Sequence, residues 1–266
     1  MKRHFHKMHG LGNDFVIVDA RQAPFAVTPG LARAIADRRT GVGCDQLIVL
    51  EPSEAADLKM RIWNSDGGEV ESCGNATRCV VQLTGARRID SDGGMLEGEE
   101  AGAEVEVSLR EPAFGWEDIP LAYATDTAPV PMAWDGLAHP IAVNVGNPHL
   151  VFFVDDVNDV PLERLGPRIE ADSAFPERIN VNVAEVGDDG IRLRTWERGA
   201  GLTLACGTGA CATAVAAIRT KRAASPVRIT MPGGFLTVAW EPGGPVRMRG
   251  TATHVFEGEL DLDALQ

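Results

Sequence analysis

The segment MRIWNSDGGEVESC at residues 60–73 has a second copy in the same chain, LRTWERGAGLTLAC at residues 193–206. In each copy a tryptophan stands ten positions before the final cysteine, which is Cys73 in the first copy and Cys206 in the second. A glycine follows each cysteine, and a segment with the composition of a helix follows each glycine. Self-similarity of this kind indicates an internal duplication.

Further segments repeat upstream of both cysteines in the same order. They are GNDFVIVD (12–19) with GNPHLVFFVD (146–155), and DQLIVLE (45–51) with INVNVAE (179–185). Asn13 precedes Cys73 by 60 positions, and Asn147 precedes Cys206 by 59. Short strand segments resemble one another by chance, but several matches in one order predict a duplicated α/β unit of about 115–135 residues. Two copies predict two lobes related by a pseudo-two-fold, with equivalent features facing each other across a cleft.

Hydrophobic periodicity predicts a mixed α/β (α+β) chain with many short strands. Strands are expected at 14–19, 46–51, 58–63, 103–109, 141–146, 150–155, 179–186, 190–196, 226–231, 235–240 and 246–250. Helices are expected near 29–38, 74–85, 161–166 and 208–220. The sequence MPGG at 231–234 is typical of a hairpin turn. The helix from Gly209 is small and apolar on all sides, so it is predicted to lie inside a curved sheet.

The predicted lobes divide the chain near its middle. Residues 1–115 form the N-terminal lobe with Cys73, to which a C-terminal strand at about 254–266 returns, and residues 116–253 form the C-terminal lobe with Cys206. The segment 110–140 is rich in Pro and Ala and lacks a clear period, so it is expected to contain the connection between the lobes.

Composition excludes several classes of function. The chain has 266 residues and a net charge of −13, so binding to nucleic acid or to an anionic membrane is disfavoured. The N-terminus MKRHFHKMHGLGNDF is basic but has no apolar run after it, and no stretch of 18 apolar residues occurs. We therefore predict a cytoplasmic protein with no nucleic-acid or membrane partner.

The five cysteines are the candidates for chemistry. Their number is odd, their spacings are not those of zinc sites, and a reducing compartment disfavours disulfides, so no metal is predicted. Cys44, Cys79 and Cys211 are interpreted as core residues. Cys73 and Cys206 each stand at a predicted helix start, where the partial positive charge lowers a thiol pKa and backbone N–H groups bind a carboxylate.

Two such sites facing each other suit inversion at the α-carbon of an amino acid. One thiolate removes the α-proton, the opposite thiol returns a proton on the other face, and the helix ends stabilise the developing negative charge. A pyridoxal phosphate enzyme needs a lysine for its Schiff base. The four lysines, Lys2, Lys7, Lys59 and Lys221, all lie outside the glycine-rich and duplicated motifs, so a pyridoxal phosphate mechanism is disfavoured.

A set of motifs then resembles a known family, the diaminopimelate epimerases. The motifs are HGLGNDF (9–15), GCDQ (43–46), WNSDGGEVESCGNATRC (63–79), GNPH (146–149), ERINV (177–181), WERGAGLTLACGTGAC (196–211), PGG (232–234) and THVFEGE (253–259). The resemblance covers nearly the whole chain. It implies two pseudo-symmetric lobes, each a β-barrel-like sheet around a central helix, and a homodimer.

The resemblance also implies an activity and a site. The reaction is the cofactor-independent interconversion of LL- and meso-diaminopimelate, in lysine and peptidoglycan precursor biosynthesis. Cys73 and Cys206 match the catalytic pair, with Cys73 the proton donor and Cys206 the acceptor in one direction, and His149 and Glu197 match positions that assist catalysis. Residues that match substrate contacts are Asn13, Gln46, Asn64, Gly74, Asn75, Asn147, Asn180, Glu197, Arg198, Gly207 and Thr208. Arg198 suits the distal carboxylate of the substrate.

Two positions depart from the family pattern, and two other functions stay open. Leu202 stands where the family usually has Glu, which removes a carboxylate close to the site, and Ala76 stands where Gly is common. The same fold in a racemase or epimerase of proline or hydroxyproline would need no distal charged contact. A redox switch would instead join Cys73 and Cys206 in a disulfide.

Overall fold

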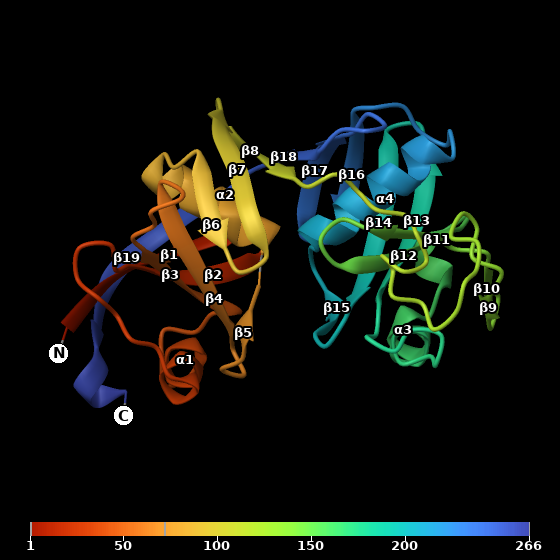
Figure 1. Ribbon diagram of the computed structural model, residues 1–266. Coiled ribbons are helices and arrows are strands. Elements are labelled where there is room, and N and C mark those ends of the chain that lie inside the picture. The colour runs from red at the N-terminus through yellow and green to blue at the C-terminus, as the bar shows by residue number, and fades with distance from the viewer. Residues whose placement is uncertain (1, 72, 266) are drawn as a thin grey trace. The chain divides into compact units, whose positions relative to one another are not determined.

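The computed structural model describes residues 2–71 and 73–265 and divides the chain into two compact units. The first unit comprises Met1–Val107 with Gly250–Gln266, and the second comprises Ser108–Arg249. The boundaries expected from the sequence, after residues 115 and 253, lie C-terminal to the divisions after Val107 and Arg249. Strands and a few helices alternate in both units, which confirms the mixed α+β class (Figure 1).

The first unit is a sheet of strands that pair in the order β19–β1–β2–β3–β4–β6–β7. The β2–β3 and β4–β6 pairs are parallel, and the others are antiparallel. The strands are β1 (Lys2–Gly10), β2 (Asn13–Asp19), β3 (Gln46–Glu51), β4 (Leu58–Asn64), β5 (Glu69–Val70), β6 (Arg88–Ser91), β7 (Gly94–Ala101), β8 (Glu104–Leu109) and β19 (Thr253–Asp261). The helices are α1 (Pro29–Ala36) and α2 (Gly74–Thr84). A 3₁₀ turn, η2 (Leu262–Ala264), follows β19.

The second unit repeats these connections. Its strands pair in the order β11–β12–β13–β14–β16–β17–β18, and the β12–β13 and β14–β16 pairs are parallel, as are the second and fourth pairs of the first unit when counted from β1. The strands are β9 (Ala133–Trp134), β10 (Leu137–Ala138), β11 (Ile141–Asn144), β12 (Pro148–Phe153), β13 (Asn180–Gly187), β14 (Gly190–Glu197), β15 (Gly201–Thr203), β16 (Val227–Met231), β17 (Gly234–Ala239) and β18 (Val246–Gly250). The other elements are η1 (Val157–Asp159), α3 (Leu162–Glu170) and α4 (Gly207–Arg219). The same order of parallel and antiparallel pairs in both units is what a duplicated sequence predicts.

The helix α4 is the centre of the second unit. It is built from alanine and other small residues, and ten of its thirteen residues are buried. It contacts six strands, which are β11, β12, β13, β14, β16 and β17 (Figure 1). Because small side chains let the surrounding strands approach on every side, the prediction of a helix inside a curved sheet is confirmed for this unit. Met231 pairs with Gly234, which confirms the hairpin turn between β16 and β17.

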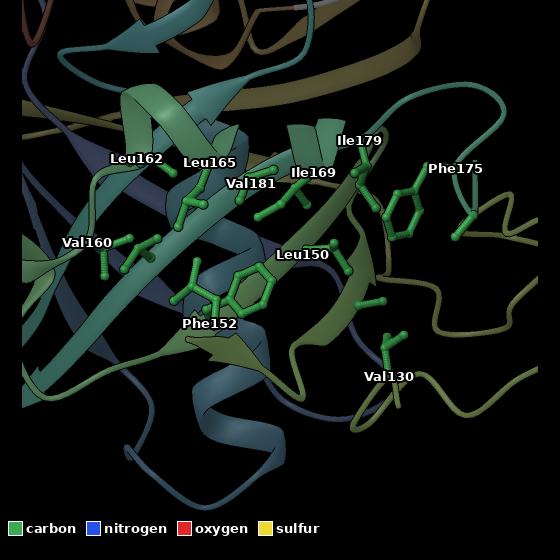
Figure 2. Close-up of a cluster of buried hydrophobic side chains, with 14 of the residues drawn as sticks. Val130, Leu150, Phe152, Val160, Leu162, Leu165, Ile169, Phe175, Ile179 and Val181 are labelled. Carbon is green, nitrogen blue, oxygen red and sulfur yellow. The ribbon is translucent and has the colours of Figure 1, made fainter. Parts of the chain in front are cut away.

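A hydrophobic cluster on the other side of the β12–β13 strands anchors α3. Leu162, Leu165 and Ile169 of α3 pack with Leu150 and Phe152 of β12 (Figure 2). The segment 110–140 belongs to this unit, and its buried residues Ile119, Leu121, Val130 and Leu137 join the same cluster. The expectation that this segment holds the connection between lobes is therefore wrong. Its apolar residues are spaced irregularly, so periodicity did not reveal that they fill a core.

Candidate functional site

Cys73 and Cys206 occupy the same structural position in the two units. Each is the N-cap residue of a helix, Cys73 of α2 and Cys206 of α4. Their backbones are extended, with φ/ψ of −149°/111° and −120°/111°. In each helix the residues that follow present N–H groups with no partner inside the helix. Each unit thus places a thiol beside a set of N–H donors.

The Cys206 thiol is buried, with 4% of the residue exposed. Burial raises its pKa well above the ordinary value, and the Glu197 carboxylate beside it raises the pKa further. The Thr208 hydroxyl and the Gly209 N–H, 3.5 Å and 3.3 Å from Sγ, oppose this shift of the pKa but do not cancel it. The prediction that the helix N-terminus lowers the thiol pKa is therefore wrong for Cys206, because desolvation outweighs the helix end.

Glu197 is held against Cys206 by its own strand and the next. It ends β14, and the Thr203 hydroxyl from β15 donates to its Oε1 at 2.5 Å. The thiol of Cys206 hydrogen-bonds to the same carboxylate. Leu202 is 42% exposed on β15. The carboxylate nearest the thiol is thus that of Glu197, which Thr203 orients.

His149 is fully buried on β12 and is bonded through both ring nitrogens. Its Nε2 lies 2.9 Å from Asn147 Oδ1, and its Nδ1 lies 3.1 Å from Asn182 Nδ2. Burial lowers its pKa to about 3, and the charge of Arg198 acts in the same direction. His149 is therefore a neutral imidazole at physiological pH.

Asn180 and Arg198 are joined through the backbone. The Asn180 side chain donates to Pro148 O at 2.8 Å and accepts from the backbone N–H of Arg198 at 2.9 Å. The Arg198 guanidinium donates to Glu177 O at 3.0 Å. The Asn180 amide thus links the backbone at the start of β12, through Pro148, to the backbone just after β14, through Arg198.

In the first unit, a polar network lies around the start of α2. Asn13 Oδ1 is 3.8 Å from Cys73 Sγ and accepts from Asn75 Nδ2 at 3.2 Å. Asn13 in turn donates to Asp45 at 2.9 Å. The Asn75 Oδ1 accepts from Arg78 at 2.8 Å, and the Arg78 side chain is fully buried. A buried cation one turn inside the helix adds positive potential where a carboxylate would bind.

Gln46 and Asn64 are cross-strand neighbours on β3 and β4. Gln46 Nε2 donates to Asn64 Oδ1 at 2.9 Å. Because the oxygen of the Asn64 amide faces Gln46, its N–H groups point away from Gln46. Gln46 Oε1 is buried and has no hydrogen-bond partner among the described residues. An unpaired buried acceptor costs free energy unless a donor is supplied, so this oxygen suits an ammonium group.

The sequence matches one family. The diaminopimelate epimerase model matches residues 5–111 and 141–255, which is most of the chain. The chain belongs to the diaminopimelate epimerase family. It is 63% identical to a diaminopimelate epimerase of Rhizorhabdus wittichii, over 99% of this chain and 97% of the relative. It is 60% identical to one of Sphingopyxis alaskensis, over 98% of each chain.

Solved structures with low identity share the epimerase fold. A phenazine biosynthesis protein of the PhzF family from Bacillus anthracis matches with a TM-score of 0.69 at 15% identity, over 98% of this chain and 99% of that one. A probable proline racemase from Agrobacterium radiobacter matches with a TM-score of 0.69 at 13% identity, over 98% of this chain and 93% of that one. At such identities the likeness concerns the fold alone.

The candidate residues of this epimerase family member fall into two groups, one in each unit. The first unit brings together Cys73, Gly74, Asn75 and Asn13 at α2, with Gln46 and Asn64 side by side on β3 and β4. The second unit gathers Cys206, Gly207, Thr208 and Glu197 at α4, and Asn147, His149, Asn180 and Arg198 at the ends of β12–β14.

The other cysteines are buried in the interior, as expected. Burial raises the pKa of Cys44 to about 11 and that of Cys79 to about 12. Cys211 is fully buried in α4. These surroundings disfavour the thiolate, so the three residues fit the role of core side chains.

Sequence reasoning missed the residues that orient the site. Arg78, Asp45, Asn182 and Thr203 bond to candidate residues, and Thr195 bonds to Asn182. Arg78, Asn182 and Thr195 are buried polar residues inside helix or strand segments, where the predicted pattern calls for apolar side chains. That mismatch is the signal that points to them.

Proposed function

We propose that this chain is a diaminopimelate epimerase that interconverts LL- and meso-diaminopimelate without a cofactor, in lysine and peptidoglycan precursor biosynthesis. The observation that carries the proposal is the equivalent placement of Cys73 and Cys206, each the N-cap of the helix that follows the duplicated motif, in a chain of this family. Inversion needs one proton-transfer group on each face of the α-carbon, and a duplicated chain supplies two.

In the proposed reaction, Cys206 and Glu197 act as one proton-transfer unit. The raised pKa keeps Cys206 as a thiol, which suits the step in which it gives a proton to the carbanion. For the opposite direction the thiol must ionise, and the Glu197 carboxylate that accepts its hydrogen bond is in place to take the proton. Thr203 holds that carboxylate in position.

Cys73 supplies the second proton-transfer group. Its sulfur lies beside the Asn13 amide oxygen, and the Asn13 amide is fixed by Asp45 and Asn75. The buried Arg78 lies one turn into α2, the helix that Cys73 caps. In the direction in which Cys206 donates, Cys73 removes the α-proton.

The remaining candidates bind the substrate. The N–H groups at Gly74, Asn75, Gly207 and Thr208 bind the carboxylate at the reacting centre, where negative charge develops. Gln46 Oε1 accepts from an ammonium group, and Asn64 and Asn147 amides donate to carboxylate oxygens. Arg198 binds the distal carboxylate, with Asn180 fixing its backbone.

The proposal is tested by α-proton exchange in deuterated water with a panel of amino acids. LL- and meso-diaminopimelate are expected to take up deuterium and interconvert, whereas proline, hydroxyproline and lysine are not. Lysine is the matched control because it lacks only the distal carboxylate. Exchange of proline at a rate equal to that of diaminopimelate would contradict the proposed substrate.

Three further properties belong to the proposal. The enzyme works without pyridoxal phosphate, and three of its four lysines are ion-paired, to Glu259, Asp14 and Asp92. It is a homodimer, for which Val255 and Phe256, 54% and 47% exposed on β19, offer an apolar contact surface. It is cytoplasmic; no helix among the described residues has the length and apolar character needed to cross a bilayer. Light scattering tests whether the enzyme is a homodimer. Full activity after dialysis against hydroxylamine is expected if the enzyme works without pyridoxal phosphate.

A further inference from the structure

A buried chain of hydrogen bonds runs from β14 to Asn147 in the second unit. Thr195 Oγ1 donates to Asn182 Oδ1 at 3.0 Å, and Asn182 Nδ2 lies 3.1 Å from His149 Nδ1. His149 Nε2 then lies 2.9 Å from Asn147 Oδ1. Thr195, Asn182 and His149 are at most 3% exposed, so water does not compete for these bonds.

The backbone carbonyl of Leu150 fixes the direction of the hydrogen bonds between these side chains. Asn182 Nδ2 also bonds to Leu150 O at 3.0 Å, and a backbone carbonyl can only accept. The atom facing Leu150 and His149 must therefore be the amide nitrogen, which donates to His149 Nδ1. Because Nδ1 accepts, the proton of the neutral ring sits on Nε2 and is donated to Asn147 Oδ1.

We propose that Asn182 and Thr195 are positioning residues that hold His149 as its Nε2–H tautomer, and that this tautomer sets which end of the Asn147 amide faces the substrate. With Asn147 Oδ1 bound to His149, the Asn147 N–H groups are the ones left to donate to a carboxylate. The inference rests on the proposed function only in its last step, the contact of Asn147 with substrate.

The first turn of α4 packs against these hydrogen-bonded side chains. A Cβ atom at Gly209 would stand 2.7 Å from Asn182 Oδ1 and 3.0 Å from Thr195 Oγ1. Glycine is thus required for the close approach of the helix that carries Cys206 at its N-cap. The network therefore ties the orientation of Asn147 to the helix end where the carboxylate is proposed to bind.

The test is nitrogen NMR of the imidazole of His149 together with kinetics, on the intact enzyme. The wild type is expected to show a protonated Nε2 and an accepting Nδ1 at pH 7. Thr195→Val and Asn182→Leu are expected to mix the two tautomers, and to reduce kcat/KM for diaminopimelate by about tenfold, the effect of one hydrogen bond. Thr213→Val is the matched control, because Thr213 is also fully buried and its hydroxyl has no hydrogen-bond partner among the described residues.

The two readouts separate this inference from the proposed function. A protonated Nδ1 or an imidazolium in the wild type at pH 7 would overturn the assignment of the tautomer. An unchanged tautomer in Asn182→Leu would overturn the positioning role. Loss of the tautomer preference with no effect on kcat/KM would overturn the link to Asn147. A lack of diaminopimelate turnover in the wild type would instead reject the proposed function, whatever the NMR shows.

A second and independent observation is a group of imidazoles where the first and last strands of the chain pair. His4 and His6 stand two residues apart on β1; Glu257 of β19 pairs with His6, and His254 of β19 pairs with Met8, the next residue on that face of β1. His6 Nδ1 is 3.2 Å from His254 Nε2 and 3.7 Å from Glu257 Oε2, and His4 Nε2 is 3.5 Å from that same oxygen. Donor atoms around a tetrahedral zinc ion lie about 3.3–3.4 Å apart, since each Zn–N bond is about 2.0–2.1 Å.

We also infer that His4, His6 and Glu257, whose donor atoms lie within 4.8 Å of one another, form a binding site for a divalent transition metal such as zinc, with His254 beside His6 as a further ligand. Imidazole donors select zinc, nickel or copper over magnesium. A bound ion would cross-link the two terminal strands of the first unit.

Cobalt(II) is the probe, because its visible spectrum distinguishes nitrogen and oxygen ligands from thiolates. One equivalent is expected to bind with no thiolate charge-transfer band, and zinc at a hundredfold excess over its Kd is expected to raise Tm by about 5 °C. His6→Ala and His254→Ala should abolish both effects, whereas His139→Ala, which removes an exposed imidazole of the other unit, should not. A thiolate band, binding retained in His6→Ala, or no binding at all would each refute the site.

Discussion

Replacement of Glu197 by Gln separates the two effects that this carboxylate has on Cys206. Glutamine keeps the shape of the side chain and an oxygen that accepts from Thr203, but it carries no charge and cannot take a proton. The Glu197 carboxylate raises the pKa of the Cys206 thiol, so its removal favours the thiolate. The variant is therefore expected to have a more easily ionised thiol and a slower reaction.

The expected loss of rate is that of a general base. Such a group contributes about 10²–10⁴-fold, which corresponds to about 2.7–5.4 kcal/mol of transition-state stabilisation. Because a substitution cannot change the equilibrium between LL- and meso-diaminopimelate, kcat/KM must fall by the same factor in both directions. Circular dichroism of the substrate measures the rates, and pH-dependent alkylation with peptide mass spectrometry measures the ionisation of Cys206.

Glu185→Gln is the matched control, since Glu185 is in the same unit but is paired with Arg192. It is expected to change neither the turnover nor the alkylation profile of Cys206. An alkylation profile of Glu197→Gln that matches the wild type, or that moves to higher pH, would refute the reasoning. A rate within threefold of the wild type would refute the role of Glu197 as the base.

Three further substitutions test packing and polarity around the site. Gly209→Ala should lower the free energy of unfolding by about 1–2 kcal/mol, because its Cβ would stand 2.7 Å from Asn182 Oδ1; urea denaturation measures this. Arg78→Met should cost about 2–4 kcal/mol, since Asn75 Oδ1 and Thr251 O both lose a donor, and the exposed Arg87→Met serves as its control. Leu202→Glu should alter the free energy of unfolding by no more than about 0.5 kcal/mol, because the side chain is exposed, and a larger drop in thermal denaturation would show that Leu202 packs.

Local patterns predicted some of the buried elements near the candidate site well. The strand expected at 46–51 is Gln46–Glu51, and the helix expected at 208–220 is Gly207–Arg219. In both, the hydrophobic pattern and the real burial agree, because each is surrounded by the core. The strand Lys2–Gly10 was not predicted, since its His and Lys side chains mask the alternation of buried and exposed positions.

Properties that depend on the assembled core were beyond the sequence. The helix N-terminus predicted a lowered thiol pKa, but the burial of Cys206 and the approach of Glu197 come from tertiary packing, and they raise it. The network of Thr195, Asn182 and His149 joins β14, β13 and β12, and His149 on β12 is 33 positions before Asn182 in the sequence. For the same reason sequence could name Asn147 and His149 but not the direction of the hydrogen bonds between them.

The most direct measurement of the two-base mechanism is α-proton exchange by the single variants Cys73→Ala and Cys206→Ala in deuterated water. Neither variant is expected to invert the stereocentre. One is expected to exchange the α-proton of LL-diaminopimelate only, and the other that of the reacting centre of meso-diaminopimelate only, because each retains a thiol on one face. Inversion by either variant, or exchange of the same isomer by both, would contradict the claim that Cys73 and Cys206 act on opposite faces of one carbon.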